Sequence, residues 1–514
     1  MSQQYILAHD LGTTGDKACL YEAGGKLLAS CTFGYETYYP QFNWVEQKPA
    51  EWWKAVCDST QKLLKENKIS PDEIACVSFS GQMLGCVPID KEGRLLRESV
   101  IIWLDGRSHE EAKYIRQKMD EKKLYHITGA SLRGESYSRA KIMWLKKNEP
   151  EIFKKVYKFL NCKDYIIYRF TGKILTDFSD ASQTGLLDIN EKNWSEEVLE
   201  ITGIPGEMMP EIHSSIDIAG EVTPLAAEQT GLRAGTPVVV GGGDVCTTAA
   251  GAGAIKEGRV YNYLGSSSWI AAASNKPLFE DKIRPYIIVH VIPGMFTSQV
   301  AIFSACISYE WVKDNLCQVE DEQAKKLGRD VYDIMEELAS EVNPGSDNLF
   351  FFPSMAGTGN PDFNVNIRGG FIGLGLNHKK GHLIRAAIEG VLFNLRLILE
   401  LFEKAGIDIK EMRAVGGGAK SGLWRQLMAD IFGKRILQPS ILQEVGSLGA
   451  AVAGGVGVGI FKDFSVMDRF IEIVDVHEPR PAVRGKYEEL FPVFKDLYEA
   501  LGPYYERLAL MGND

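Results

Sequence analysis

The sequence predicts an α/β protein of two domains, and three observations support this fold class. The 514 residues exceed what one hydrophobic core usually supports. Apolar strands alternate with helical periodicity along the first part of the chain, which is typical of an α/β domain. The same order returns in the second half, and each half opens with a β-hairpin around a G-[ST]-[ST] turn. We therefore expect a duplicated domain with a cleft between the copies, the first formed by 1–243 and the second by 244–514.

The first half is expected to begin with strands. Apolar residues on both sides of the turn HDLGTTGDK predict a hairpin, and Gly24 and Gly25 predict a second turn after it. The stretch PAEWWKAVCDSTQKLLKEN (49–67) has helical periodicity, and IACVSFSG (74–81) is typical of a buried strand. Residues 238–240, all valine, predict another buried strand that leads into a run of glycines.

The second half repeats this order. VYNYLGSSSWIAAAS (260–274) again predicts strand, turn and strand, and helical patterns follow near 304–316 and 381–404. MRAVGGGAKSG predicts a strand that ends in a glycine turn. The small and apolar stretch 446–461 is too short and too rich in glycine to span a bilayer, so we expect a closely packed buried helix. From about residue 480 the pattern predicts a closing helix.

Composition and charge limit the classes of function. Apolar residues make up 45% and charged residues 24% of the chain, and the net charge of −11 gives no general attraction to nucleic acid or to an anionic membrane. The first ten residues lack the basic and apolar regions of a secretory signal. Nine cysteines without CxxC spacing are typical of reduced thiols. We therefore expect a cytoplasmic protein that binds neither nucleic acid nor membrane, with a local basic patch as the open alternative.

The turn HDLGTTGDK has the residue types of a phosphate-binding loop. Gly12 lets backbone amides face a ligand, and Thr13 and Thr14 add hydroxyl donors. Lys17 has the charge and the reach for a polyphosphate, and Asp10 at the end of a strand is a candidate ligand of a hydrated Mg²⁺. Taken alone, an ordinary hairpin with turn residues explains this motif equally well.

Two glycine-rich turns in the second half extend the pattern. Gly265 and Ser266 in LGSSSW repeat the first turn, and two such hairpins facing each other are suited to hold the phosphates of one nucleotide. In VGGGAKSG, the glycines at 416–418 stand between a strand and a helix that starts near Ser421, where flat backbone admits an adenine ring. The pattern is not GxGxxG, which disfavours a dinucleotide-binding dehydrogenase.

Asp244 is a single carboxylate in TPVVVGGGDVCTTAAGAG (236–253), a run otherwise almost free of charge. A base that deprotonates a hydroxyl must be ionised and within hydrogen-bond reach, and no bulky side chain can block in-line attack on a γ-phosphate. Small residues around an acid near the junction of two domains meet both demands. We therefore predict that Asp244 is a catalytic base; an N-cap of the following helix is the alternative, and both roles are compatible.

In combination, these motifs resemble the FGGY family of carbohydrate kinases, most closely its xylulokinase branch, over nearly the whole chain. AKIMWLKKNEP (140–150) is similar to the first family signature, with Lys141 and Trp144 in place. GGFIGLGLNHKKGHLIRAAIEG (369–390) matches the second signature from Gly370. GGGD…GAG, GGGAKSGLWRQ and WLDGR are also similar to xylulokinase segments and occur in the family order.

The resemblance implies a fold and a reaction. The fold is that of two ribonuclease-H-like domains of the actin/Hsp70 ATPase type with a central cleft. The reaction is transfer of the γ-phosphate of ATP, with Mg²⁺, to a hydroxyl of a small carbohydrate, with Asp244 as the base and with Asp10 and Asp244 at the metal. The residues implied in ATP binding are Gly12, Thr13, Thr14, Lys17, Gly265, Ser266, Glu310, Gly417, Gly418 and Gly422. The residues implied in sugar binding are Gln82, Met83, Leu84, Trp103, Asp105 and Asp244.

Several of the sugar candidates have a structural alternative. Met83 and Trp103 are also typical of a hydrophobic core. Asp105 together with Arg107 also fits a purely structural ion pair. The residue types alone do not choose between these roles.

Two positions depart from the xylulokinase pattern. Typical xylulokinases carry His where this chain has Leu84, and Asn where it has Leu104. Loss of a buried hydrogen-bonding group costs roughly 1–3 kcal/mol per unpaired hydroxyl, which is enough to change the preferred substrate. D-Xylulose or a related ketose is the first expectation, and ribulose, a deoxy sugar, a polyol or a sugar acid stays open. A non-catalytic sugar and nucleotide sensor on the same fold is the alternative function, and a homodimer is a common state in the family.

Overall fold

The computed structural model describes residues 5–130, 134–281, 284–355, 357 and 366–511. The chain divides into two compact units. Unit 1 comprises Met1–Glu257, Ala273–Ser298 and Glu444–Ile471, and unit 2 comprises Gly258–Ala272, Gln299–Gln443 and Glu472–Asp514. The sequence prediction placed one boundary between residues 243 and 244. The units of the structure instead part first after Glu257, because Asp244 and the helix that it begins stay with the first sheet.

The main sheet of unit 1 consists of β1 (Tyr5–Leu11), β2 (Gly15–Glu22), β3 (Leu27–Gly34), β5 (Ile74–Gly81), β13 (Ile218–Glu221), β14 (Pro237–Val239) and β15 (Gly242–Gly243). Its order is β13-β14-β5-β1-β2-β3, and β15 also pairs with β5. Strand β1 lies between β2 and β5, which explains why its run YILAHDL is buried almost throughout. Strand β3, at the edge, alternates between half-buried and exposed residues.

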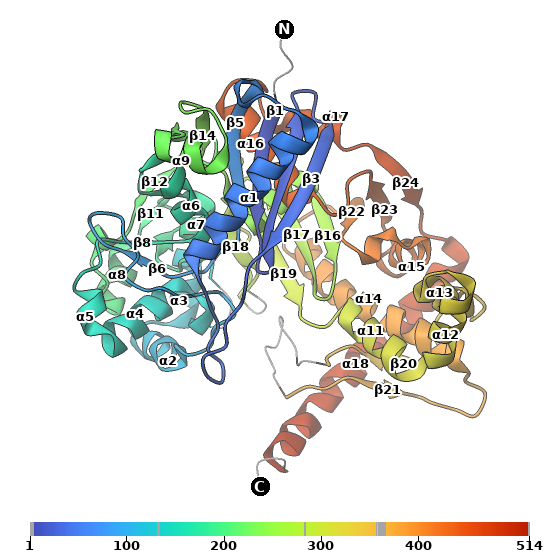
Figure 1. Ribbon diagram of the computed structural model, residues 1–514. Helices are drawn as coiled ribbons and strands as arrows, with labels where there is room; N and C mark the ends of the chain where they lie inside the picture. The colour runs from blue at the N-terminus through green and yellow to red at the C-terminus, as the bar shows by residue number, and fades with distance from the viewer. Residues whose placement is uncertain (1–4, 131–133, 282–283, 356, 358–365, 512–514) are drawn as a thin grey trace. The chain divides into compact units, whose positions relative to one another are not determined.

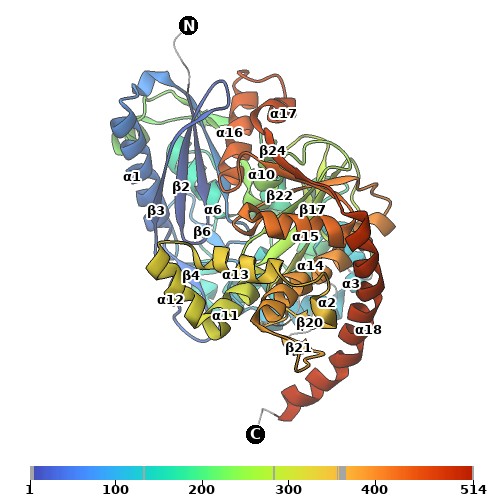
Figure 2. The same ribbon diagram turned by 90° about the vertical axis from the view of Figure 1, so that its right-hand side faces the viewer.

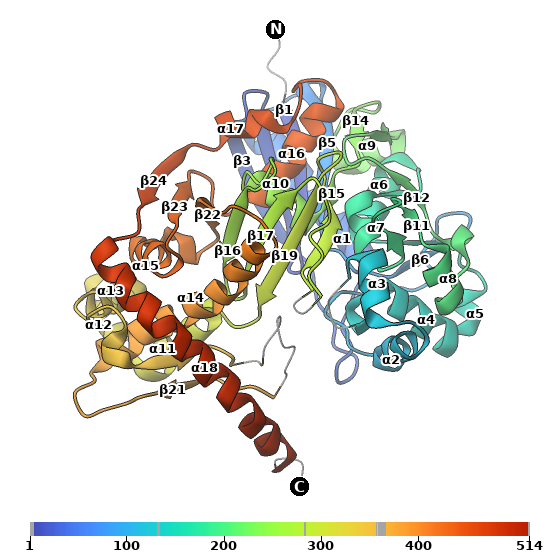
Figure 3. The same ribbon diagram turned by 180° about the vertical axis from the view of Figure 1, so that it is seen from behind.

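Helices cover both faces of this sheet. Helix α1 (Pro49–Asn67) packs on one face (Figure 1), and α10 (Asp244–Gly251) and α16 (Val445–Gly457) lie on the opposite face (Figure 3). Helix α16 needs its glycines because it packs closely: a Cβ on Gly449 would lie 2.0 Å from Thr247 O of α10. The buried helix expected within 446–461 is thereby confirmed, and it belongs to unit 1.

The rest of unit 1 consists of short elements. Its small strands pair in twos: β4 (Glu46–Gln47) with β7 (Val100–Ile101), β6 (Val87–Ile89) with β8 (Lys158–Leu160), β9 (Leu175–Asp177) with β12 (Glu211–His213), and β10 (Leu187–Asp188) with β11 (Asn193–Trp194). The helices are α2 (His109–Lys118), α3 (Glu121–Thr128), α4 (Ser138–Asn148), α5 (Pro150–Phe153), α6 (Cys162–Thr171), α7 (Phe178–Gln183), α8 (Glu196–Thr202), α9 (Pro224–Thr230) and α17 (Met467–Phe470), and β18 (Tyr286–Val289) packs against α7.

The second main sheet has the order β18-β19-β17-β16-β22-β23-β24, and apart from β18 its strands lie wholly or mainly in unit 2. These strands are β16 (Val260–Leu264), β17 (Ser268–Ser274), β19 (Phe296–Ile302), β22 (Glu411–Val415), β23 (Arg435–Pro439) and β24 (Ile473–His477), and a separate pair is β20 (Phe350–Phe352) with β21 (Gly370–Ile372). The helices are α11 (Cys306–Leu316), α12 (Gln318–Leu327), α13 (Val331–Ser340), α14 (Lys380–Lys404), α15 (Gly422–Phe432) and α18 (Pro481–Met511). Figure 2 shows α15 beside β24 and the closing helix α18.

The two units repeat one arrangement of strands. In unit 1, β1 is antiparallel to β2 and parallel to β5. In unit 2, β16 is antiparallel to β17 and parallel to β22. Both hairpins close on the predicted G-[ST]-[ST] turns, so the predicted repeat is confirmed. Over the described ranges, no helix combines the length and the apolar character needed to cross a bilayer.

Candidate active site

The first candidate loop is the tight turn between β1 and β2. Antiparallel pairing puts Asp10 opposite Lys17, and Gly12 N donates to Gly15 O at 3.0 Å to close the turn. Thr14 at the tip is exposed. The turn therefore presents Thr14 at its surface, and a hydroxyl is one of the donors that a phosphate group accepts from.

Asp10 lies next to this turn, at the end of β1. Its Oδ1 accepts from Ser80 Oγ at 2.6 Å. On the other side Gly446 of α16 approaches so closely that a Cβ there would lie 2.8 Å from Asp10 Oδ2. Burial raises the pKa of Asp10, while the hydrogen bond from Ser80 and the charge of Lys17 oppose that shift.

Asp244 is the first residue of α10. The N-cap of this helix is Gly243 and not Asp244, so the alternative prediction, that Asp244 is the N-cap, is wrong. The Asp244 carboxyl is half-buried. Burial raises its pKa to about 7, the negative charge of Asp10 adds to the shift, and the N–H of Val245 opposes it. An acid with this pKa changes its protonation state near neutral pH, where a general base is most effective.

Hydroxyl groups link the surroundings of the two acids. Thr247 Oγ1 donates to Ser80 Oγ at 2.8 Å, and Ser80 in turn donates to Asp10. Thr247 lies in the first turn of α10, directly above Asp244. The acids are near enough for the charge of Asp10 to raise the pKa of Asp244.

Mg²⁺ is usually held by one or two carboxylates together with substrate phosphates. Asp10 and Asp244 fit that donor set, because they are two carboxylates close enough for the charge of Asp10 to raise the pKa of Asp244. Within the part of the chain that the structure describes, no group of three or more His, Cys, Asp and Glu side chains is suited to hold a metal ion. The two acids therefore fit a metal ion that arrives with a nucleotide better than a permanent metal site.

The sugar candidates Gln82, Met83 and Leu84 follow β5 directly and are all buried. Met83 packs on Gly243, where a Cβ would lie 2.3 Å from Met83 Cε, so it reaches the residue before Asp244. Leu84 has a φ of +65°, a conformation that leucine rarely adopts. Gln82 Oε1 is buried and has no hydrogen-bond partner among the described residues. Backbone strain and an unsatisfied acceptor are both typical of functional sites.

Trp103 and Asp105 lie in different environments. Trp103 is 39% exposed, and its Nε1 donates to Thr13 Oγ1 at 2.9 Å. This hydrogen bond connects Trp103, a candidate sugar-binding residue, to the turn at 12–15. Asp105 is buried and accepts from Arg107 Nη2 at 2.7 Å and from Val45 N at 2.5 Å. The carboxylate of Asp105 is thus engaged by the protein itself, which favours the structural ion pair over a substrate contact.

Unit 2 contains a cavity of about 570 Å³, within the usual range for small-ligand sites. Five segments form it: the β16–β17 turn, the start of α11, helix α13, the glycine turn after β22, and the start of α15. The predicted residues Gly265, Ser266, Glu310, Gly417 and Gly418 are among those that line it, and Gly422 is not. A Cβ on Gly417 would have no heavy atom of the described ranges within 4 Å, whereas a Cβ on Gly418 would lie 2.7 Å from Leu264 Cγ.

Sequence reasoning missed much of this lining. Helix α13 and the residues before it contribute Asp330, Asp333 and Glu336, and the aromatic side chains include Tyr309 and Trp424. With Glu310, the cavity has four carboxylates, which repel phosphates but accept hydrogen bonds from hydroxyl groups. It therefore suits a nucleoside better than a triphosphate. Nothing in the sequence indicated that α13 lines a cavity, because its pattern is that of any amphipathic helix.

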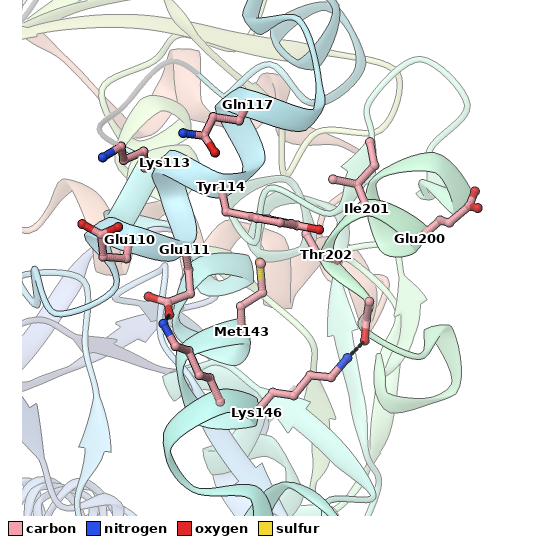
Figure 4. A pocket seen from close by; sticks show the side chains of 12 residues that line it. Glu110, Glu111, Lys113, Tyr114, Gln117, Met143, Lys146, Glu200, Ile201 and Thr202 are labelled. Carbon is pink, nitrogen blue, oxygen red and sulfur yellow. Dashed lines mark hydrogen bonds and ion pairs between the residues drawn. The ribbon is translucent and has the colours of Figure 1, made fainter.

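A larger cavity of about 760 Å³ lies between α2, α4 and α8 of unit 1 (Figure 4). Two of its three lysines are engaged by the protein: Lys146 donates to Gly203 O at 2.5 Å, and Lys147 pairs with Glu111 at 3.6 Å. The residues that line it include none of the sequence candidates. We therefore do not assign the predicted chemistry to this cavity.

Comparison with known proteins gives one family for both halves of the chain. Residues 5–251 match the N-terminal domain, and residues 260–458 the C-terminal domain, of the FGGY family of carbohydrate kinases. A gluconokinase of Bacillus licheniformis is 32% identical over 98% of both chains, and a xylulose kinase of Bacillus subtilis is 30% identical over 96% of this chain and 97% of the other. The crystal structure of a gluconate kinase from Lactobacillus acidophilus has a TM-score of 0.90 at 27% identity, covering 99% of this chain and all of the other. The fold is therefore the two-domain, actin/Hsp70-like fold that the sequence resemblance implied, and the chain belongs to the FGGY family of carbohydrate kinases.

Proposed function

We propose that this protein phosphorylates a hydroxyl of a small carbohydrate with ATP and uses Asp244 as the general base. The supporting observation is the half-buried Asp244 carboxyl, whose pKa of about 7 lies well above that of an exposed aspartate. A carboxylate of this basicity accepts a hydroxyl proton more readily than an ordinary one, and about half of it is ionised at pH 7. The glycines before it serve close packing, because a Cβ on Gly241, Gly242 or Gly243 would lie 2.1–2.3 Å from an atom of Phe79, Val291 or Met83.

In this proposal Asp244 takes the proton of the substrate hydroxyl while that oxygen attacks the γ-phosphorus of ATP. The bond from phosphorus to the β,γ-bridging oxygen breaks, and ADP leaves with the electron pair. The turn at 12–15 donates hydrogen bonds to phosphate oxygens, and Lys17 adds a positive charge. Mg²⁺, when bound with the nucleotide, neutralises phosphate charge, and Asp10 is our candidate to hold it.

We assign the nucleoside end of ATP to the cavity of unit 2. Its carboxylates, among them Glu310 and Glu336, are suited to accept hydrogen bonds from ribose hydroxyls. Gly417 leaves open space that a flat base can occupy. Gly422 begins α15 and contributes to the N-terminal end of that helix, which attracts negative charge.

For the substrate, we propose an open-chain polyhydroxylated compound, with D-xylulose or a related ketose first and gluconate as the second candidate. Relatives named xylulose kinase and gluconokinase are similar to this chain to nearly the same degree. Leu84 stands where typical xylulokinases carry a histidine, and its buried apolar side chain favours a substrate with fewer hydrogen-bonding groups at that point.

A coupled assay of ADP release tests the proposal. The panel should contain D-xylulose, D-ribulose, a deoxyketose, a tetritol and D-gluconate, each with ATP and Mg²⁺. We expect one of these to give turnover and Asp244→Asn to reduce kcat by at least about 10³-fold, with nucleotide affinity within a few-fold of wild type. Asp120→Asn, at the N-cap of α3, is the matched control and should retain activity.

The same assay separates the kinase from a non-catalytic sensor. A sensor would bind sugar and nucleotide but would release no ADP with any substrate. Wild-type turnover in Asp244→Asn would refute the role of Asp244 as the general base.

We also propose a cytoplasmic location, since all nine cysteines are free thiols, as expected in a reducing compartment. Sedimentation of the purified protein tests the homodimer that the family resemblance implies.

A further inference from the structure

Gln47 is fully buried in β4 and was not among the sequence candidates. Its Nε2 donates to Thr13 O at 2.6 Å and to Thr37 Oγ1 at 2.9 Å. Its Oε1 accepts from Trp52 Nε1 at 3.0 Å and from Gln82 Nε2 at 2.8 Å. A primary amide has two N–H donors and two acceptor lone pairs, so Gln47 uses its whole hydrogen-bonding capacity.

The partners of Gln47 determine which way its amide points. The indole N–H of Trp52 is only a donor and the carbonyl of Thr13 is only an acceptor, so Oε1 must face the first and Nε2 the second. Gln47 then offers an acceptor to Gln82, which must turn its own Nε2 toward it and its Oε1 away. That Oε1 is buried without a protein partner in the described ranges, and a buried acceptor of this kind requires a donor from elsewhere.

We propose that Gln47 is a positioning residue. It couples the turn at 12–15, the candidate phosphate loop, to Gln82, a candidate sugar-binding residue. The inference rests on the proposed function, in which Thr13 contacts ATP and Gln82 accepts a hydrogen bond from a hydroxyl of the sugar. One rigid amide holds the backbone of the first and the side chain of the second, so a displacement of either is transmitted to the other. Parallel links support the same coupling, since Gln82 N donates to Leu11 O at 2.8 Å and Trp103 Nε1 donates to Thr13 Oγ1 at 2.9 Å.

The chain contains a matched control for this role. Trp53 follows Trp52 in α1, is also buried, and donates its indole N–H to Gln229 Oε1 at 2.8 Å. Gln229 lies in α9, where its backbone O accepts from Gln61 Nε2 at 2.8 Å and its Oε1 accepts from Arg169 Nη2 at 3.5 Å. Replacing either glutamine removes an acceptor from a buried tryptophan, but only Gln47 contacts the candidate site.

Steady-state kinetics with varied ATP and varied sugar test the proposal. Gln47→Met removes four hydrogen bonds and should raise both KM values and lower kcat, each by about tenfold. Gln229→Met should keep all three within about twofold, whatever its effect on the melting temperature. A folded Gln47→Met with wild-type kcat and KM values would show that Gln47 is merely structural and would overturn the proposal.

A double-mutant cycle tests whether Gln47 acts through Gln82. Gln82→Met should raise KM for the sugar alone, and adding Gln47→Met should raise it little further, because the same contact is already lost. Fully additive effects on the sugar KM would contradict the coupling.

A milder pair of variants covers the case in which Gln47→Met does not fold. Trp52→Phe removes only the donor that orients Gln47, and Trp53→Phe removes the equivalent donor to Gln229. Trp52→Phe should raise the KM values about threefold over Trp53→Phe, as expected for one hydrogen bond. Equal kinetics in the two variants would overturn the proposal.

Failure of the proposed function is recognised separately, in the wild type. If wild type phosphorylates no sugar of the panel, the inference is decided by calorimetric titration with ATP and Mg²⁺. Gln47→Met must then bind ATP about tenfold more weakly than wild type and Gln229→Met, since the Thr13 contact is lost. Equal affinities, or no binding of ATP to any of the three proteins, would overturn the inference.

Discussion

Asp10 of β1 and Gly446 of α16 meet so closely that a Cβ on the glycine would lie 2.8 Å from Asp10 Oδ2. Real Cβ atoms essentially never come within 3.0 Å of a heavy atom, so any other residue at 446 must displace the carboxylate or the helix. Two residues from opposite ends of the chain thus define the space around one acid of the candidate active site.

Gly446→Ala should therefore impair catalysis. We expect kcat to fall by about 10²-fold, as for a displacement of a catalytic group by about 1 Å, and the Mg²⁺ concentration required for half-maximal rate to rise. Gly485→Ala is the control, because a Cβ at that position in α18 meets nothing within 4 Å. It should retain activity and gain up to about 1 kcal/mol of stability from helix propensity. Equal activities in the two variants would contradict the importance of the Asp10 contact.

Asp244 should make the stability of the metal-free protein depend on pH. Burial raises its pKa from an ordinary value of 3.8 to about 7, so the folded state holds this proton more tightly than the unfolded state. The contribution of Asp244 to stability is present below pH 3.8 and is lost as the pH rises to about 7. Asp244→Asn should thus be more stable than wild type at pH 8 and equal to it near pH 4, as measured by urea denaturation. A constant difference across this range would contradict the shift.

Lys163 should be essential for the stability of unit 1. It is fully buried with Asp164, Asp177 and Asp180, at 2.8, 3.3 and 3.3 Å. Although burial lowers the pKa of Lys163, the three carboxylates raise it above its usual range, and burial raises the pKa of Asp180. Lys163→Met leaves buried acids without a cation and should destabilise the protein by about 3–5 kcal/mol.

Denaturation of a double variant checks this explanation. Asp180→Asn added to Lys163→Met should recover part of the lost stability, because it removes one of the buried acids. No recovery, or a loss below about 1 kcal/mol for Lys163→Met alone, would be inconsistent with a charge-balanced cluster.

Gly417→Val should weaken nucleotide binding without damage to the fold. The position has a φ of −61° and open space around its Cβ, so valine fits the backbone and extends into the cavity of unit 2. We expect the affinity for ATP, measured by calorimetry, to fall by at least about tenfold, because the valine side chain occupies the space that we assign to the adenine ring. The melting temperature should stay within about 2 °C of wild type. Unchanged ATP affinity would argue that the nucleoside binds elsewhere.

Leu84→His should shift the preference among sugars. The substitution restores the residue that typical xylulokinases carry, and histidine adopts a positive φ more readily than leucine does. We expect the ratio of kcat/KM for D-xylulose over that for the best wild-type substrate to rise at least about tenfold, which corresponds to one restored hydrogen bond. If D-xylulose is already the best wild-type substrate and the variant loses activity on it, Leu84 is not the reason for a changed specificity.

Local sequence patterns were sufficient to predict several of the main helices and strands and both hairpins. The predicted helix at 49–67 is α1, the predicted strand at 74–81 is β5, and the helix predicted near 381–404 is α14. These succeed because side-chain periodicity, proline at a helix start and glycine at a turn act within a few residues of each other. The same local signals located the turn at 12–15 and the acid at 244, whose functional roles stay predictions.

Which segments meet was settled by the tertiary structure alone. It returned α16 to the first sheet, against Asp10, gave the cavity of unit 2 the carboxylates of α13, and joined Gln47 to Thr13 and Gln82. Contacts of this kind connect residues that are far apart in the chain, and their geometry depends on how whole sheets and helices pack. The residue type of a glutamine or a glycine is the same in a loop, a core or an active site, so its role is identified only by the residues that it contacts in the folded protein.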